Sequence, residues 1–158
     1  MEKITRLALY IVNGSKKRRL ILGISAKAFG RIIGKSEEYV QNIESSRKGH
    51  YSHIDFPKIA AALDWQVHDL LPPDNSPYSD GTLVDKIIFS LTNPSDAEEV
   101  IVGMKEIGYF KKKKSLKDIF EYLYLTEDMI EKRQVIIEVL DKLILNDVLK
   151  LQNGSYLA

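Results

Sequence analysis

The sequence contains no cysteine among its 158 residues. This absence excludes disulfide bridges, thiolate nucleophiles and cysteine-ligated zinc or iron–sulfur sites, and it fits a reducing cytoplasm. Apolar runs are also short, well below the ~18 residues that a membrane-spanning helix needs. The N-terminal stretch does not resemble a secretory signal peptide, because a basic cluster follows its short apolar run and no small-residue cleavage site is present. We therefore expect a soluble, cytoplasmic protein with no membrane partner.

Proline is scarce as well, and three of the 5 prolines fall between positions 72 and 77. Together with Gly81 and several short polar residues, these prolines prevent a helix from continuing. The sequence thus predicts a linker over residues 73–82, a first domain over residues 1–72 and a second domain over residues 83–158.

The net charge of +1 conceals two halves of opposite sign. Residues 1–71 hold 12 Lys and Arg against 7 Asp and Glu, whereas residues 72–158 hold 11 against 15. A basic half favours contact with a polyanion such as nucleic acid. We therefore expect the first domain, rather than the second, to bind one.

Apolar residues at three- and four-residue spacing predict that the first domain is helical throughout. A first helix covers residues 4–12, and the pattern leaves open whether it continues through Gly14 to Leu22 before Gly23 ends it. Hydroxyl caps and terminating glycines then delimit short helices. The expected helices cover residues 26–33 (capped by Ser25), 37–45 (capped by Ser36), 56–63 and 67–71.

The second domain is expected to combine helices with a β-hairpin. The helices cover residues 83–91, 95–107 (opened by a capping box at Ser95), 115–124 and 126–146. Asn153-Gly154 between two short alternating segments is a strong hairpin signal. Successive helices closed by a hairpin are typical of a winged helix-turn-helix. The predicted fold class is therefore mainly α, with a C-terminal winged-helix-like domain.

Two short helices of the first domain are placed to form a helix-turn-helix. The helices over residues 26–33 and 37–45 meet across Gly34-Lys35-Ser36, where the glycine permits a sharp turn. Val40 and Ile43 are expected to anchor the second helix to the core. Its outer face then suits recognition of base edges in the major groove. That face carries Glu37, Glu38, Gln41 and Asn42.

Residues 18–71 resemble the XRE family of phage-repressor and Cro-like helix-turn-helix proteins. The resemblance is carried by Gly23-Ile24-Ser25, Phe29-Gly30, Gly34-Lys35-Ser36, Val40, Ile43-Glu44, Pro57–Leu63 and Asp69-Leu70-Leu71. It implies a Cro/repressor-like helix-turn-helix bundle that binds double-stranded DNA as a homodimer. It also implies that Arg19 forms an ion pair with Glu44 at the end of the recognition helix.

The resemblance further implies which residues contact DNA. The positions that match base-reading residues of the family are Glu37, Glu38 and Asn42. Ser36 matches a position that contacts a phosphate or a base at the start of the helix, and Lys35 lies beside it.

The chain departs from the family pattern at three places. Many members carry a DNA-contacting glutamine where this chain has Ala26, and they often carry Gln, Ser, Thr or Arg where it has Glu37 and Glu38. Carboxylates accept hydrogen bonds from cytosine N4, but they repel phosphates. The loop that follows the recognition helix is longer than in phage repressors. Arg47 and Lys48 in this loop are expected to supply phosphate contacts.

Three other motifs in the chain carry alternative chemistry. Gly30–Ser36 resembles a phosphate-binding loop, but its spacing is one residue short and no strand precedes it. His50 and His53 are spaced as metal ligands, yet no third ligand is in view, so no metal site is predicted. No serine or threonine has a paired base. We therefore expect neither enzymatic activity nor a cofactor.

Two features of the second domain leave alternatives open. Lys111–Lys114 is either solvated surface or a contact for phosphates or an acidic partner. The helix over residues 126–146 is acidic in its first half and broadly apolar, which favours dimerisation or a protein partner over a second DNA contact.

Together these patterns favour a sequence-specific, DNA-binding transcriptional regulator of bacterial or phage type that works as a homodimer. Residues 37–45 would read the major groove, and residues 83–158 would supply the dimerisation or protein-partner surface. The alternative is a protein-interaction module, such as an antitoxin or an adaptor, that uses the helix-turn-helix fold without reading DNA.

Overall fold

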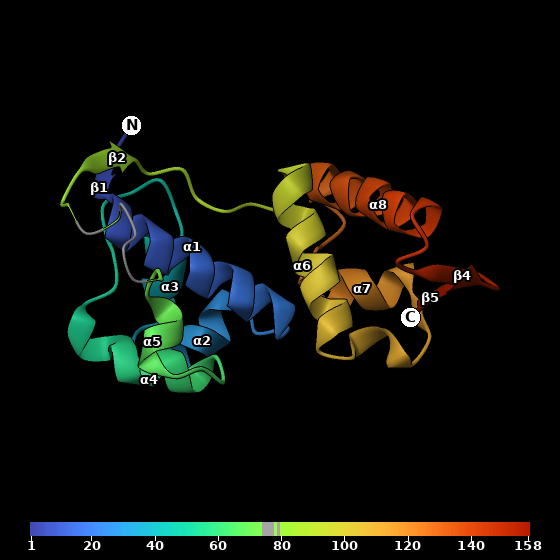
Figure 1. The fold of residues 1–158 in the computed structure, drawn as a ribbon, viewed down its shortest axis with the longest axis horizontal. Helices are drawn as coiled ribbons and strands as arrows, with labels where there is room; N and C mark the ends of the chain where they lie inside the picture. Colours follow the sequence, from blue (N-terminus) through green and yellow to red (C-terminus); the bar gives the residue numbers. More distant parts are fainter. Residues whose placement is uncertain (74–77, 79) are drawn as a thin grey trace. The chain divides into compact units, whose positions relative to one another are not determined.

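A computed structural model describes residues 1–73, 78 and 80–158. The chain is mainly α-helical, with small antiparallel sheets that include a C-terminal β-hairpin. It divides into two compact units, Met1–Phe89 and Ser90–Ala158 (Figure 1). Within the predicted linker, residues 74–77 and 79 lie outside the described residues. In the described part of the chain, every helix is too short or too polar to span a bilayer.

The first unit combines short helices with a two-stranded sheet. Its elements are β1 (Lys3–Thr5), α1 (Arg6–Ile21), α2 (Ala26–Ile32), α3 (Tyr39–Ile43), η1 (His53–Asp55), α4 (Phe56–Ala62), α5 (Val67–Leu70) and β2 (Leu83–Asp85). The helix α1 continues through Gly14, which settles the question that the sequence left open. It ends just before Gly23, whose φ is +70°. The predicted cap of α2 is confirmed, because Ser25 Oγ accepts a hydrogen bond from the backbone N–H of Ala28 (3.0 Å).

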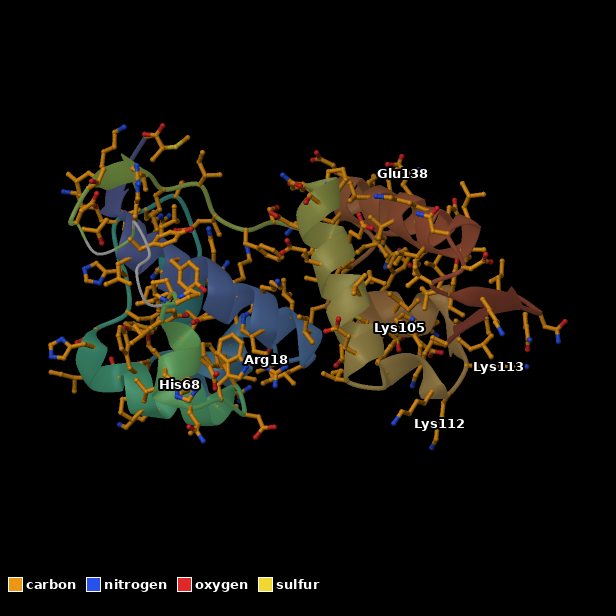
Figure 2. All side chains as sticks on the ribbon, in the orientation of Figure 1. Arg18, His68, Lys105, Lys112, Lys113 and Glu138 are labelled. Carbon is orange, nitrogen blue, oxygen red and sulfur yellow. The ribbon has the colours of Figure 1, made fainter. Side chains whose placement is uncertain are left out.

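Apolar side chains from these helices meet in one core. The buried members are Ile11, Val12, Phe29, Ile33, Val40, Ile43, Tyr51, Ile59, Ala60, Leu63 and Leu70. Arg18, near the end of α1, connects this helix to the residues that follow α4 (Figure 2). Its Nε donates to the carbonyl of Leu63 (3.0 Å), and its guanidinium lies 5.5 Å from the centre of the Trp65 ring. The core therefore joins α2 and α3 to α1.

Residues 83–91 do not form the helix that the sequence predicts. Leu83–Asp85 instead form β2, which pairs antiparallel with β1 so that Val84 lies opposite Ile4 (Figure 1). Ile4, which the apolar spacing assigns to the first helix, therefore lies in a strand. This pairing holds residues 83–89 in the first unit, so the two units divide after Phe89 rather than before residue 83. A short apolar run cannot be assigned to a helix or a strand from periodicity alone.

The second unit combines helices with a small sheet whose strand order is β3-β5-β4. Its elements are α6 (Pro94–Glu106), η3 (Tyr109–Lys111), β3 (Lys114–Ser115), α7 (Leu116–Tyr122), α8 (Ile130–Leu145), β4 (Lys150–Gln152) and β5 (Ser155–Leu157). The predicted hairpin is confirmed, and its turn residues Asn153 and Gly154 have φ values of 49° and 76°. Fully buried side chains in this unit include Ile101, Met104, Phe110, Ile119, Ile136, Leu140 and Leu149.

Two helices of the second unit begin at other residues than predicted. Asn93, and not Ser95, caps α6, because its side-chain oxygen accepts hydrogen bonds from the N–H groups of residues 95 (2.9 Å) and 96 (3.3 Å). The helix α8 begins at Ile130 and not at Thr126. A guanidinium N–H of Arg133 donates to the carbonyl of Leu125 (2.8 Å) and holds the preceding residues in a loop.

Candidate functional site

The turn between α2 and α3 depends on two glycines. Gly34 has a φ of +75°, which favours glycine, and it ends α2 as predicted. Gly30 lies in α2 where the chain after the turn crosses it, and a Cβ at this position would lie 2.8 Å from the carbonyl oxygen of Ser36. The N–H of Lys35 donates to the carbonyl of Gly30 (2.8 Å) and closes the turn. The two helices can therefore approach closely only with glycine at position 30.

The helix α3 is shorter than the predicted segment 37–45, since it runs from Tyr39 to Ile43. Ser36 does not cap it through its side chain; the N–H of Tyr39 instead bonds the backbone carbonyl of Ser36 (3.2 Å). A single turn at residues 37–38 leads into the helix. Val40 is fully buried and Ile43 is 4% exposed, so α3 packs on the core as expected. The exposed residues around α3 are Ser36, Glu37, Glu38, Gln41 and Asn42.

A buried ion pair fixes the end of α3 to α1. Arg19 Nε donates to Glu44 Oε1 (2.9 Å) and Arg19 Nη2 donates to Oε2 (2.6 Å), while Nη1 bonds the carbonyl of Ile24 (2.7 Å). The two charged side chains are only 6% and 5% exposed. These are the residues that the family resemblance pairs. The bidentate geometry fixes the direction of α3 as well as its distance from α1.

Ion pairs neutralise part of the charge around α3. Lys27 Nζ lies 3.1 Å from a carboxylate oxygen of Glu37, and both side chains are exposed. Lys35 Nζ lies 3.0 Å from the carboxylate of Asp55, which raises the pKa of the lysine through that hydrogen bond. Its ammonium also lies 5.4 Å from the centre of the Tyr39 ring. A cation beside Glu37 reduces the repulsion that this carboxylate would exert on a phosphate.

The loop after α3 displays two cations. Ser45 Oγ donates to the carbonyl of Asn42 (2.6 Å) and accepts from the N–H of Arg47 (3.2 Å), so the loop starts in a tight turn. Arg47 and Lys48 are exposed. Lys86, by contrast, is 3% exposed, and its Nζ donates to the carbonyl of Arg47 (2.6 Å) and to that of Gly49 (2.9 Å).

Sequence reasoning did not single out Lys86. It placed this residue in a helix over 83–91, where one lysine among apolar neighbours is typical of an ordinary surface position. The signal that was available is the apolar run Ile87-Ile88-Phe89 that follows it directly, because a lysine can lay its apolar stem along apolar surface.

The structure gives no support to the alternative chemistry of this region. The ammonium of Lys35, the lysine of the phosphate-loop-like motif, forms an ion pair with Asp55. The motif begins within the helix α2 and does not follow a strand. His50 Nδ1 lies 3.1 Å from the carbonyl of Tyr51. Within residues 1–73, 78 and 80–158, no group of three or more His, Cys, Asp or Glu could hold a metal ion.

The second unit has a basic surface and a separate apolar hollow. Lys111, Lys112 and Lys113 are exposed, and the last two point away from the ribbon of their unit in Figure 2. Lys114 Nζ lies 4.7 Å from the centre of the Tyr109 ring. The hollow, of about 330 Å³, lies where α7 leads into α8. It is lined by Phe120, Glu121, Tyr124, Leu125, Thr126, Glu127 and Arg133.

The exposed side chains of α3 and the cations of the loop that directly follows it are the candidate recognition residues of the first unit. Comparison of the chain with protein-family models, with curated proteins and with solved structures finds no match.

Proposed function

We propose that this chain is a cytoplasmic, sequence-specific DNA-binding transcriptional regulator that works as a homodimer. In this proposal the first unit is a Cro/repressor-like helix-turn-helix bundle and the second is a winged-helix-like domain. The observation that carries the proposal is the buried pair of Arg19 and Glu44, which holds α3 so that its polar residues face outward. A helix fixed in this way can enter the major groove without losing its own packing.

The proposed interface divides base reading from phosphate binding. The amides of Gln41 and Asn42 can each donate to and accept from one adenine edge, and the carboxylates of Glu37 and Glu38 can accept from cytosine N4. Because carboxylates cannot bind phosphates, the affinity must come from flanking groups. Arg47 and Lys48 supply exposed cations for this purpose, and Ser36 supplies a hydroxyl. Lys35 would bind a phosphate only by giving up the carboxylate of Asp55 that now holds its ammonium.

Selection by the full-length protein from a random duplex library, at near-physiological salt, tests the proposal. We expect an enriched inverted repeat whose half-sites lie about one helical turn, ~34 Å, apart. The substitution Asn42→Ala should relax specificity at one base pair, whereas Lys48→Ala should weaken binding to all duplexes alike. A folded protein that enriches no sequence would contradict the proposal.

A second candidate function is a protein-interaction module, such as an antitoxin or an adaptor. It is favoured by α8, on which Ile130 and Leu145 are 74% and 82% exposed and Glu131 and Glu138 are exposed as well. An acidic surface with exposed apolar side chains suits a protein partner or a second copy better than DNA. Salt dependence separates the candidates, because phosphate contacts make duplex affinity fall steeply with salt.

A further inference from the structure

Lys86 holds a charge in a place where a lysine is rarely found. Its side chain is 3% exposed, and burial lowers the pKa of its ammonium group. Burying a charge costs free energy unless hydrogen bonds compensate for the lost water. Here the compensation comes from the carbonyls of Arg47 and Gly49, at 2.6 and 2.9 Å, and from the nearby negative charge of Glu2. The ammonium thus binds the backbone of the loop that displays Arg47 and Lys48.

The backbone that carries Lys86 is itself fixed on both sides. The N–H of Lys86 donates to the carbonyl of Glu2 (2.9 Å), next to the pairing of β1 with β2. The side chain of Asn13, on α1, donates to the carbonyl of Ile87 (3.0 Å) and accepts from the N–H of Phe89 (2.9 Å). Lys86 therefore connects the loop to a rigid base.

The loop has little else to define its shape. Residues 45–50 contain no helix or strand, and Gly49 has a φ of +139°. The hydrogen bonds of Ser45 remain within the loop and the end of α3. Lys86 supplies two hydrogen bonds that join the backbone of residues 46–49 to a distant part of the chain.

We propose that Lys86 is a positioning residue for DNA-backbone binding: through the carbonyls of Arg47 and Gly49, it holds the loop so that the side chains of Arg47 and Lys48 reach phosphates. This inference rests on the proposed DNA-binding function. Lys86 itself does not touch the duplex. It acts by ordering the loop before the duplex binds, so that the loop loses less conformational entropy on binding.

A double-mutant cycle on the full-length protein tests this role. The cycle compares four proteins: the wild type, Lys86→Met, Arg47→Ala/Lys48→Ala, and the variant that combines all three substitutions. The affinity of each for a duplex selected by the wild type is measured over a range of salt concentrations. In the wild-type background, Lys86→Met should make the slope of log affinity against log salt shallower by about 1 to 2, since each phosphate contact contributes about 0.9. In the Arg47→Ala/Lys48→Ala background the same substitution should leave the slope unchanged and alter the affinity by less than about 1.5-fold, because the groups that Lys86 positions are gone.

Lys3→Met is the matched control. Lys3 lies on β1, which pairs with the strand that ends just before Lys86. Its side chain is 58% exposed, and its Nζ pairs with Asp85 at 2.5 Å rather than with the loop. The substitution removes the same charge from the same unit and should leave the salt slope unchanged. Thermal unfolding of each variant identifies a temperature at which all are folded. If Lys86→Met does not fold, Lys86→Gln, whose amide can donate to one carbonyl, takes its place in the cycle.

The outcomes distinguish this inference from the function on which it rests. A wild-type protein that binds no duplex would overturn the proposed function. A wild type that binds, together with a Lys86→Met that weakens binding equally in both backgrounds or leaves the salt slope unchanged, would give Lys86 a purely structural role and overturn the inference.

Discussion

Arg19 and Glu44 form the interaction on which the direction of α3 depends most directly. Their side chains are almost fully buried and are joined by two hydrogen bonds in a bidentate arrangement. Removal of one partner therefore leaves the charge of the other without compensation. We expect Glu44→Gln to lower the free energy of unfolding by about 3 kcal/mol, measured by urea denaturation. Glu37→Gln is the control, because its pair with Lys27 is exposed and should be worth less than about 1 kcal/mol. Equal losses in the two variants would contradict the structural role assigned to Arg19.

Tyr51 predicts how the protein responds to high pH. Burial first, and the carboxylate of Glu44 second, raise the pKa of the Tyr51 phenol above its usual value of about 10. The folded protein therefore keeps this proton where the unfolded chain releases it. Its contribution to stability is present below pH ~10 and declines above it, by up to about 1.4 kcal/mol per pH unit.

The substitution Tyr51→Phe isolates this contribution. The hydroxyl of Tyr51 is buried and has no hydrogen-bond partner among the described residues, so its removal should raise the free energy of unfolding at pH 7 by about 1 kcal/mol. Above pH 10 the variant should also lose stability less steeply than the wild type. Denaturation curves measured between pH 7 and pH 11 check both expectations. If the stability of the variant declined with pH as steeply as that of the wild type, Tyr51 would not be the source of the wild-type decline.

Two glycines predict effects of opposite sign on the elements that contain them. Gly14 lies within α1, and a Cβ added there would meet no atom of a neighbouring element within 4 Å, so Gly14→Ala should stabilise the helix by about 0.5–1 kcal/mol. Gly154 has a φ of +76° in the β4–β5 turn, so Gly154→Ala should destabilise the hairpin by about 1 kcal/mol. Denaturation of each variant, followed by hydrogen exchange, shows which unit changes. If both substitutions changed the stability in the same direction, the backbone conformation assigned to one of the two glycines would be wrong.

The elements that the sequence predicted well are those with a local signal. Ser25 and the hairpin turn at Asn153-Gly154 lie where short patterns placed them, because caps and tight turns depend on a few neighbouring residues. β1 and β2 were not predicted, because a strand of three residues is stable only when it pairs with another strand, and here the two strands lie far apart along the chain. The hydrogen bonds of Lys86 were not predicted for the same reason. Its carbonyl partners lie 39 and 37 residues away, and no spacing within the sequence indicates them.

At the scale of the whole molecule, the division after Phe89 makes a prediction about truncation. A chain of residues 1–89 keeps β2, Lys86 and the bonds to Asn13, and we expect it to fold. A chain that ends at residue 82, where the sequence placed the domain boundary, loses them. It should be less stable by about 2 kcal/mol, because the apolar side chain of Ile88 no longer covers the core and the hydrogen bonds of Asn13 and Lys86 are lost as well. Urea denaturation of the two chains compares them, and equal stabilities would contradict the observed division.

The segment that leads out of the first unit also sets the order in which that unit would yield to force. A load applied through Ser90 reaches the Asn13 hydrogen bonds at Phe89 and Ile87 first, and then the ammonium of Lys86. The position of α3 does not depend on this segment, because Glu44 anchors the helix to α1. If the first unit binds DNA as proposed, tension from the second unit would therefore loosen the contacts of Arg47 and Lys48 with phosphates before it disturbed the contacts of α3 with bases. In mechanical terms, load would weaken the hold on the DNA backbone before it changed which bases are read.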